Sequence, residues 1–247
     1  KNGWPFSSAF HTKFPEYVHA RTHLPLEWLY AAMRRFHGPS SSVLAPSPSV
    51  YRELTARQFT NVRAWSHGVD ADVFRPRPKD SLDLPRPIHM FVGRVAIEKN
   101  LPAFLELEIP GSKVVVGSGP DRDMLIRRFP DAHFLIADGD EQLAGYFSAA
   151  DIFVFPSRTD TFGLTMLEAL ACGVPVAAFP VTGPLDVLGL TGPGETAYGC
   201  LDEDLTAAIG RAAGKAPDAC RAHALGFSWE RVTDEFLTFL APIDAAA

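Results

Sequence analysis

The chain has 247 residues, 47% hydrophobic and 21% charged, a balance typical of a globular protein with room for one large domain or two smaller ones. Its net charge of −6 lacks the basic excess of a general nucleic-acid binder, and no apolar run approaches the roughly 20 residues of a membrane-spanning helix. The three cysteines have neither CxxC nor Cys/His metal spacing, which predicts thiols without disulfides in a reducing compartment.

The first strand-like segment ends at Ala9-Phe10, and His11 follows it directly. A histidine between a strand and a loop is a candidate site residue, although an ordinary half-buried histidine is the simpler interpretation of this residue alone. Further along, the pattern predicts a strand over residues 43–45, a helix over 50–58 capped by Ser49, and a strand over 62–65.

Residues 25–37 predict an amphipathic helix, because apolar side chains recur at helical spacing from Trp28 to Phe36. Packing against its own domain is the simpler interpretation of this apolar stripe. Contact with a membrane surface is the alternative, since basic residues lie beside the aromatic ones.

Residues 74–87 are rich in proline and charge and have no apolar periodicity, so we interpret them as a linker. After them, short apolar runs alternate with helical segments, one of which Asn100 is expected to cap. This alternation predicts βαβ units, with a buried parallel sheet and helices on both faces. The predicted strands are 88–92, 113–116, 134–136, 152–155 and 176–179.

Arg94 and Lys99 follow the first of these strands, at the carboxyl edge where sheets of this kind bind ligands. An arginine that can clamp phosphate oxygens and a lysine that supplies a point charge suit a diphosphate. The alternative is a solvated pair in which Lys99 is bridged to Glu98. The loop from Gly117 to Pro120 lacks the third glycine of the dinucleotide fingerprint, which disfavours a Rossmann dehydrogenase.

We interpret Gly117 and Gly119 as a tight turn beside a base or ribose, because Asp121 and Asp123 would repel an anion there. The next candidate is Phe162-Gly163-Leu164, which begins a helix whose free backbone N–H groups suit a phosphate or sugar oxygen.

Two carboxylates belong to the same stretch of chain. Asp160 lies in the turn before the helix, and Glu168 lies one turn beyond Leu164 on an otherwise apolar helix. A carboxylate on such a helix needs a partner, and ribose hydroxyls are suitable ones. The alternative is that Glu168 points to water.

Together these residues resemble the family-4 retaining glycosyltransferases of GT-B architecture, and the resemblance covers nearly the whole chain. The motifs that carry it are Phe10-His11-Thr12, Gly68-Val69-Asp70 through Phe74-Arg75-Pro76, Gly93-Arg94 with Glu98-Lys99-Asn100, Gly117-x-Gly119-Pro120, Ala150-Asp151 with Pro156-Ser157, Asp160-Thr161-Phe162-Gly163 through Glu168-Ala169 to Gly173-Val174-Pro175, and Phe227-Ser228-Trp229-Glu230.

The resemblance implies an α/β fold of two Rossmann-like domains. We expect a partial N-terminal, acceptor-side domain over 1–73, a linker over 74–87, a C-terminal sugar-nucleotide domain over 88–226, and a helix over 227–247 that docks back on the body. It further implies transfer of a hexose from a UDP- or GDP-linked donor to a hydroxyl acceptor such as a lipid or glycan, without a cofactor or an essential metal. We expect a cytoplasmic protein, or one peripheral to the inner face of the membrane.

The resemblance also implies the roles of single residues. Arg94 and Lys99 would stabilise the leaving diphosphate, and His11 would lie across the cleft near the transferred sugar. Asp160 would contact the donor sugar together with the backbone at Phe162, Gly163 and Leu164. Glu168 would hold the ribose. The glycines Gly93, Gly117 and Gly119 would lie along the nucleotide.

Two departures from the family pattern affect these expectations. Asp160 stands where the family usually has glutamate, so the carboxylate reaches less far. The 73 residues before Phe74 are fewer than the ~100 of an independent doubly wound domain, so we expect a fragment of a longer enzyme or a gene product that has lost its start. The alternative function is a truncated, inactive module that binds a sugar nucleotide.

Overall fold

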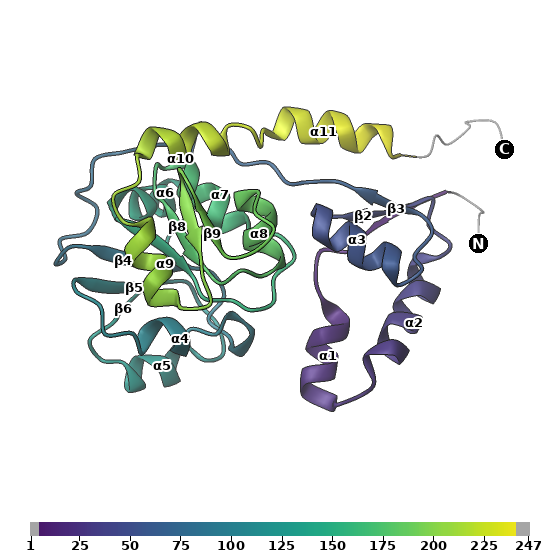
Figure 1. Cartoon of the computed structure of the whole chain (residues 1–247), viewed down its shortest axis with the longest axis horizontal. Helices are drawn as coiled ribbons and strands as arrows, with labels where there is room; N and C mark the ends of the chain where they lie inside the picture. The colour runs from purple at the N-terminus through teal and green to yellow at the C-terminus, as the bar shows by residue number, and fades with distance from the viewer. Residues whose placement is uncertain (1–4, 241–247) are drawn as a thin grey trace.

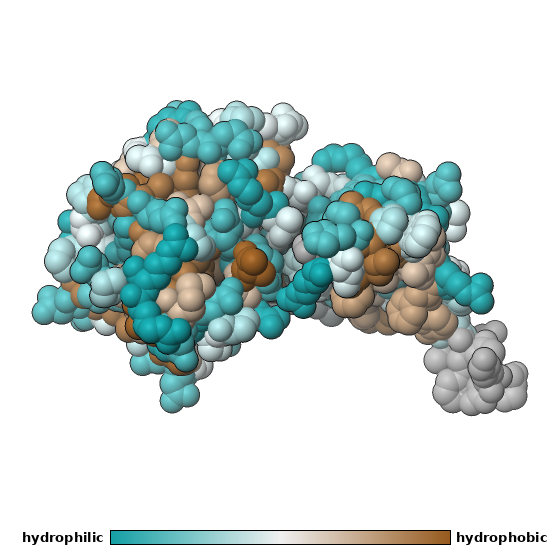
Figure 2. Space-filling model, turned by 90° about the horizontal axis from the view of Figure 1, so that it is seen from below, coloured by the Kyte–Doolittle hydropathy of each residue, from teal (hydrophilic) through white to brown (hydrophobic). Residues whose placement is uncertain are grey.

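The structure, a computed structural model, describes residues 5–240, so the extreme ends of the expected segments 1–73 and 227–247 lie outside the described residues. It contains two separate sheets, a larger one of seven strands and a smaller one of three. The two lobes built on these sheets lie side by side (Figure 1), and from below they meet at a narrower middle (Figure 2).

The smaller lobe is a parallel sheet of order β1-β2-β3, covered by three helices. Its core gathers Phe10, Tyr30, Val43 and Leu54, all buried. The strands predicted at 43–45 and 62–65 and the helix predicted at 25–37 are confirmed. The elements are β1 (Ser7–Ala9), α1 (Phe14–Thr22), α2 (Leu26–His37), β2 (Ser42–Ala45), α3 (Pro48–Ala56) and β3 (Val62–Ala64).

The larger lobe contains a seven-stranded sheet of order β6-β5-β4-β7-β8-β10-β9, parallel except for β9, which pairs antiparallel with β10. The five strands predicted from apolar runs are confirmed to within one residue at either end. Strands β9 and β10 were not predicted. The strands are β4 (Ile88–Val92), β5 (Ser112–Val116), β6 (His133–Leu135), β7 (Ile152–Phe155), β8 (Val176–Ala178), β9 (Gly194–Thr196) and β10 (Gly199–Leu201).

Helices cover both faces of this sheet and bury two apolar clusters, as the alternating pattern predicts. One cluster includes Phe147, Phe153 and Leu170, and the other includes Phe91 and Phe104. Each such side chain contributes about 1.5–3 kcal/mol by its burial. The helical elements are η1 (Ile97–Lys99), α4 (Pro102–Leu105), α5 (Arg122–Arg128), α6 (Asp140–Ala149), α7 (Leu164–Ala171), α8 (Thr182–Leu188), α9 (Leu205–Ala212), α10 (Pro217–Ala224) and α11 (Trp229–Thr238).

Two predicted helix caps are wrong, because the side chains bind elsewhere. Helix α3 is capped by Ser47, whose hydroxyl accepts from Val50 N, while Ser49 binds Asp186 of the larger lobe through both its backbone N–H and its hydroxyl. Asn100 is left-handed, with φ of 52°, and its Nδ2 donates to the Pro156 carbonyl at 3.0 Å instead of capping α4.

The chain crosses between the lobes twice, and the two crossings touch. Two hydrogen bonds join the first crossing to the second. Val69 N donates to Phe227 O at 2.9 Å, and Trp65 Nε1 donates to the Val232 carbonyl of α11 at 2.9 Å. Helix α11, yellow in Figure 1, extends from the larger lobe toward the smaller. The Phe239 carbonyl then accepts from Ser42 Oγ at 3.2 Å, which ties the end of this helix to the smaller sheet.

Cys172, Cys200 and Cys220, all within the described residues, are buried free thiols. Between residues 5 and 240, no helix combines the length and apolarity needed to cross a membrane.

Candidate active site

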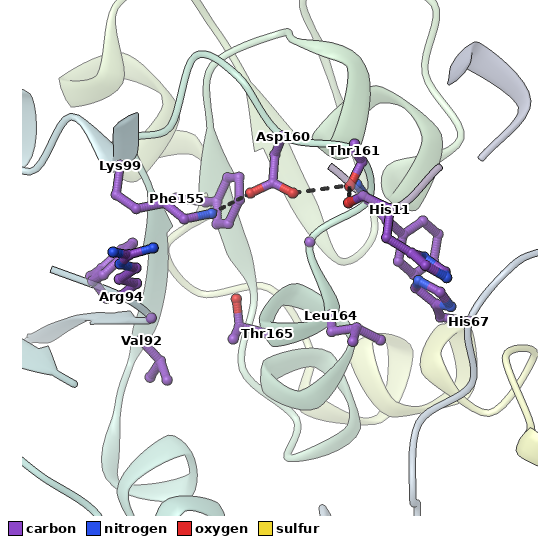
Figure 3. A pocket seen from close by; sticks show the side chains of 14 residues that line it. His11, His67, Val92, Arg94, Lys99, Phe155, Asp160, Thr161, Leu164 and Thr165 are labelled. Atoms are coloured by element: carbon purple, nitrogen blue, oxygen red, sulfur yellow. Dashed lines mark hydrogen bonds and ion pairs between the residues drawn. The ribbon is translucent and has the colours of Figure 1, made fainter. Parts of the chain in front are cut away.

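A cavity of about 490 Å³ opens between the two lobes at the carboxyl ends of β4 and β7. We call it the central cavity (Figure 3). It brings together eight residues singled out from the sequence and adds His67, which was not. The predicted residues in its wall are His11, Gly93, Arg94, Lys99, Asp160, Phe162, Gly163 and Leu164.

An ion pair between Lys99 and Asp160 occupies one side of the central cavity (Figure 3). Lys99 Nζ lies 2.6 Å from Asp160 Oδ2, and the side chains are only 21% and 13% exposed. The expected alternative partner of Lys99, Glu98, therefore does not hold it. Arg94 is exposed and has no ion-pair partner among residues 5–240, so its guanidinium can bind an anion directly.

The first turn of α7 forms the floor of the central cavity. Gly163 precedes it with φ of 91°, and no side chain of the described residues caps the helix. This position favours glycine by its backbone, because L side chains rarely adopt a φ of 91°; a Cβ there would also meet the end of the flexible Met166 side chain. The uncapped N–H groups of Leu164 and Thr165 make a site suited to an oxyanion.

Two histidines from the smaller lobe face the central cavity from the other side. The rings of His11 and His67 stack with centroids 5.0 Å apart, and Trp65 packs edge-on against both. Burial lowers the pKa of His11; burial and the charge of His11 lower that of His67 to about 4. The His67 ring is therefore neutral at pH 7, and the lowered pKa of His11 favours its neutral form.

Thr161 ties this histidine pair to the larger lobe, since its hydroxyl donates to the His11 carbonyl at 2.8 Å. His67 follows strand β3 as His11 follows β1, and that repeated placement is the sequence signal that could have identified it.

A second cavity, of about 550 Å³, adjoins the first through Gly93 and Arg94 and extends along the loop from Gly117 to Pro120. Backbone packing constrains Gly117: a Cβ there, where φ is 142°, would lie 2.0 Å from the Gly93 carbonyl oxygen. Gly117 thus lets its loop contact the loop at Gly93 through their backbones. Gly119 lines the same cavity.

Glu168 lies apart from the other predicted residues, since it lines neither cavity. It is half-buried on α7, and its carboxylate has no hydrogen-bond partner within the part of the chain that the structure describes. Burial raises the pKa of Glu168 to about 7, and the nearby charge of Asp140 adds to the shift. Both interpretations made from the sequence, a ribose contact and contact with water, stay predictions.

Between residues 5 and 240, no group of three or more histidine, cysteine, aspartate or glutamate side chains gathers in a metal-binding arrangement.

Comparison with known proteins gives a consistent result for the larger lobe. Residues 74–215 match the family model described as "Glycosyl transferases group 1". A GDP-mannose-dependent alpha-mannosyltransferase of Mycobacterium tuberculosis is 33% identical over 222 residues, covering 84% of this chain and 58% of the relative. The sulfoquinovosyl transferase SQD2 of Arabidopsis thaliana is 28% identical over 215 residues, covering 78% of this chain and 41% of the relative. The chain thus spans about half the length of the curated relatives it matches.

Solved structures share the two-lobed fold. A sucrose-phosphate synthase of Thermosynechococcus elongatus superposes with a TM-score of 0.76 at 22% identity, covering 95% of this chain and 67% of the other. Anabaena HepE, solved in complex with UDP and glucose, superposes with a TM-score of 0.73 at 17% identity, covering 97% of this chain and 72% of the other. The predicted α/β fold of GT-B type, with parallel Rossmann-like sheets, is therefore confirmed.

Proposed function

Because the chain belongs to the group 1 glycosyl transferases, we propose that its protein transfers a hexose from a nucleoside-diphosphate sugar to a hydroxyl acceptor with retention of anomeric configuration. The observation that carries this proposal is the central cavity, where eight residues expected to bind a sugar nucleotide come together from both lobes. The donors named for relatives and structural neighbours make GDP-mannose and UDP-glucose the first candidates.

The diphosphate is the part of such a donor that most needs stabilisation, because it gains negative charge as it leaves. Arg94 offers a guanidinium that has no ion-pair partner among residues 5–240, Lys99 offers an ammonium, and the first turn of α7 offers backbone N–H groups. Hydrogen-bond donors and cations that are fixed in place before the reaction stabilise the charge that develops on the leaving diphosphate. In the transfer, the acceptor oxygen bonds the anomeric carbon as the bond from that carbon to the diphosphate oxygen breaks, and the acceptor proton leaves with the diphosphate.

The hexose would lie between Asp160 and the histidine pair. Asp160 accepts hydrogen bonds, and its ion pair with Lys99 links the sugar contact to the diphosphate contact. His11 faces the same space as a neutral ring that can exchange hydrogen bonds with hydroxyls.

The nucleoside would extend into the second cavity, past Gly93, Gly117 and Gly119. Glu168 remains our proposal for the ribose contact. What supports it is the Glu168 carboxylate, which no side chain or backbone group of the described residues hydrogen-bonds and which lies on the helix that begins at the central cavity. Ribose hydroxyls would supply hydrogen-bond donors for it.

The experiment is a transfer assay with the full-length protein, GDP-mannose and UDP-glucose, using a panel of glycan and lipid acceptors. Lys99→Ala should lower kcat about 100-fold, in the range seen when one charge-stabilising donor is removed. Lys215→Ala is the matched control, because Lys215 is also ion-paired but lines neither cavity. Equal turnover in the two variants would refute the role of Lys99.

An inactive sugar-nucleotide-binding module is the second candidate, because the larger lobe alone carries Arg94, Lys99 and Asp160 of the central cavity and all residues that line the second cavity. Calorimetry with UDP and GDP separates the two: nucleotide binding without transfer to any acceptor would favour the module. Absence of nucleotide binding would refute both candidates.

A further inference from the structure

Outside the two chain crossings, the lobes also meet between helix α8 of the larger lobe and helix α3 of the smaller (Figure 1). The Asp186 carboxylate of α8 lies there against the N-terminus of α3. Its Oδ2 accepts from Ser49 N at 3.1 Å, and its Oδ1 accepts from the Ser49 hydroxyl at 2.8 Å. Both residues are half-buried. Neither lines the central or the second cavity, so the proposed donor contacts leave this contact unassigned.

The Asp186 carboxylate caps a helix that belongs to the other lobe. Ser47 is the ordinary cap of α3 and accepts from Val50 N, so the N–H of Ser49, in the first turn, has no acceptor within α3. An anion at this position gains charge-assisted hydrogen bonds and the attraction of the helix dipole. Arg52 Nη2 donates to the Ser49 hydroxyl at 2.9 Å, which strengthens the bond that this hydroxyl donates to Asp186.

On the larger lobe, α8 packs directly against the loop that carries proposed donor contacts. A Cβ at Gly183, in the first turn of α8, would lie 2.7 Å from the Phe162 carbonyl oxygen and 3.5 Å from Asp160 Cβ. Asp160 and Phe162 both line the central cavity. Because this packing leaves no room for one further methyl group, α8 and the loop move together.

On the smaller lobe, α3 belongs to the same packed unit as His11. It follows β2, which pairs in parallel with β1, and His11 lies two residues after the end of β1 at Ala9. The buried Leu54 side chain holds α3 in the core of this lobe. A contact that fixes α3 relative to α8 therefore also fixes His11 relative to Asp160 across the central cavity.

We propose that Asp186 is a positioning residue, which together with Ser49 forms an interlobe latch that holds the cleft closed and so brings His11 to the donor. The hydrogen bond from Thr161 to the His11 carbonyl is a second tie between the same two walls. The effect on turnover rests on the proposed transferase function, whereas the closure itself does not.

The closure is measured on the full-length protein by pulsed EPR between spin labels at Ala31→Cys on α2 and Arg127→Cys on α5, both exposed positions. The three native thiols are at most 4% exposed and should stay unlabelled. Ser49→Asp should add a longer distance, because two facing carboxylates favour the open arrangement at least about tenfold. Aspartate in the first turn stabilises a helix, so α3 should stay folded.

Charge reversal tests whether the two latch residues act on each other. Asp186→Lys alone should also open the cleft, since a cation then faces the positive end of α3. Combining it with Ser49→Asp should return the short distance, because an ion pair restores the attraction. Ser41→Asp, the same charge change at an exposed serine of the smaller lobe, should leave the distance unchanged. An unchanged distance in Ser49→Asp, or a double variant as open as the single ones, would overturn the latch.

Kinetics separate positioning from donor binding. Calorimetry should show equal UDP and GDP affinities in wild type and Ser49→Asp, because the residues of the second cavity all belong to the larger lobe. The kcat of Ser49→Asp should fall by the same factor as the closed fraction measured with the labels, and it should recover in the double variant. Unchanged kcat in an opened variant would refute the positioning role of Asp186. If the wild type transfers no sugar, the transferase proposal fails, while the label distances still decide the latch.

Discussion

Replacing Glu168 by glutamine should stabilise the protein above neutral pH and weaken nucleotide binding at the same time. Burial raises the pKa of Glu168 to about 7 from an ordinary value of 4.5. Because the folded state binds the proton more tightly than the unfolded state, this carboxyl does not reduce the free energy of unfolding below pH 4.5. Its destabilising effect grows as pH rises from 4.5 to 7 and is then constant. A shift of about 2.5 pKa units corresponds to about 3 kcal/mol.

Urea unfolding of wild type and Glu168→Gln at half-unit steps from pH 4.5 to 8 measures this effect. The variant's gain in unfolding free energy should rise from near zero at pH 4.5 to about 3 kcal/mol at pH 7.5. Glu230→Gln, at an exposed position, is the matched control and should show no such slope. A difference that does not change with pH for Glu168→Gln would refute the raised pKa of this half-buried carboxylate. Unchanged UDP and GDP affinity at pH 8 would refute its ribose contact.

Three further predictions concern the central cavity. Asp160→Asn should lower kcat about 100-fold. The double variant with Lys99→Ala should lose less activity than the product of the two single losses, because the residues act as one ion pair. Strictly multiplicative losses in the double-mutant cycle would contradict that coupling. Gly163→Ala should reduce the free energy of unfolding by about 1–2 kcal/mol, because an L residue is strained at φ of 91°. Urea midpoints of the two proteins measure this difference. His67→Phe should remove part of the acid lability, because a His67 pKa lowered to about 4 subtracts stability as pH falls from 6.5 to 4; thermal melts at pH 7 and 4.5 should show a smaller fall than in wild type.

Sequence reasoning succeeded where local patterns decide the structure. Continuous apolar runs such as Ile152–Phe155 form buried parallel strands, and the helix-forming run Leu164–Ala171, bounded by Gly163 and Gly173, forms α7. Once those strands are parallel, topology places their carboxyl ends on one edge. This is why Arg94 and Asp160, 66 residues apart, meet at the wall of one cavity.

The predictions that were wrong or missing concern features that depend on contacts between residues distant in the sequence. Ser47 and Ser49 both flank Pro48, and only the position of Asp186 on α8 shows which serine is left to cap α3. Lys99 lies beside Glu98 in sequence but pairs with Asp160. Strands β9 and β10 are three residues each with no apolar run of useful length, so their pairing with the sheet edge carries little local signal.

The double crossing between the lobes has a mechanical consequence. A single linker would let the lobes rotate about any axis through one point. Two chain segments that contact each other restrict the relative rotation of the lobes, so one axis of rotation is favoured. A Cβ on Gly68 would lie 2.7 Å from the Trp229 backbone nitrogen, so the two segments are closely packed where they cross and have little room to move relative to each other. Opening and closing of the cleft should therefore follow one reproducible arc. Cutting the chain before Trp229 would remove one of the two connections and let the lobes rotate about further axes.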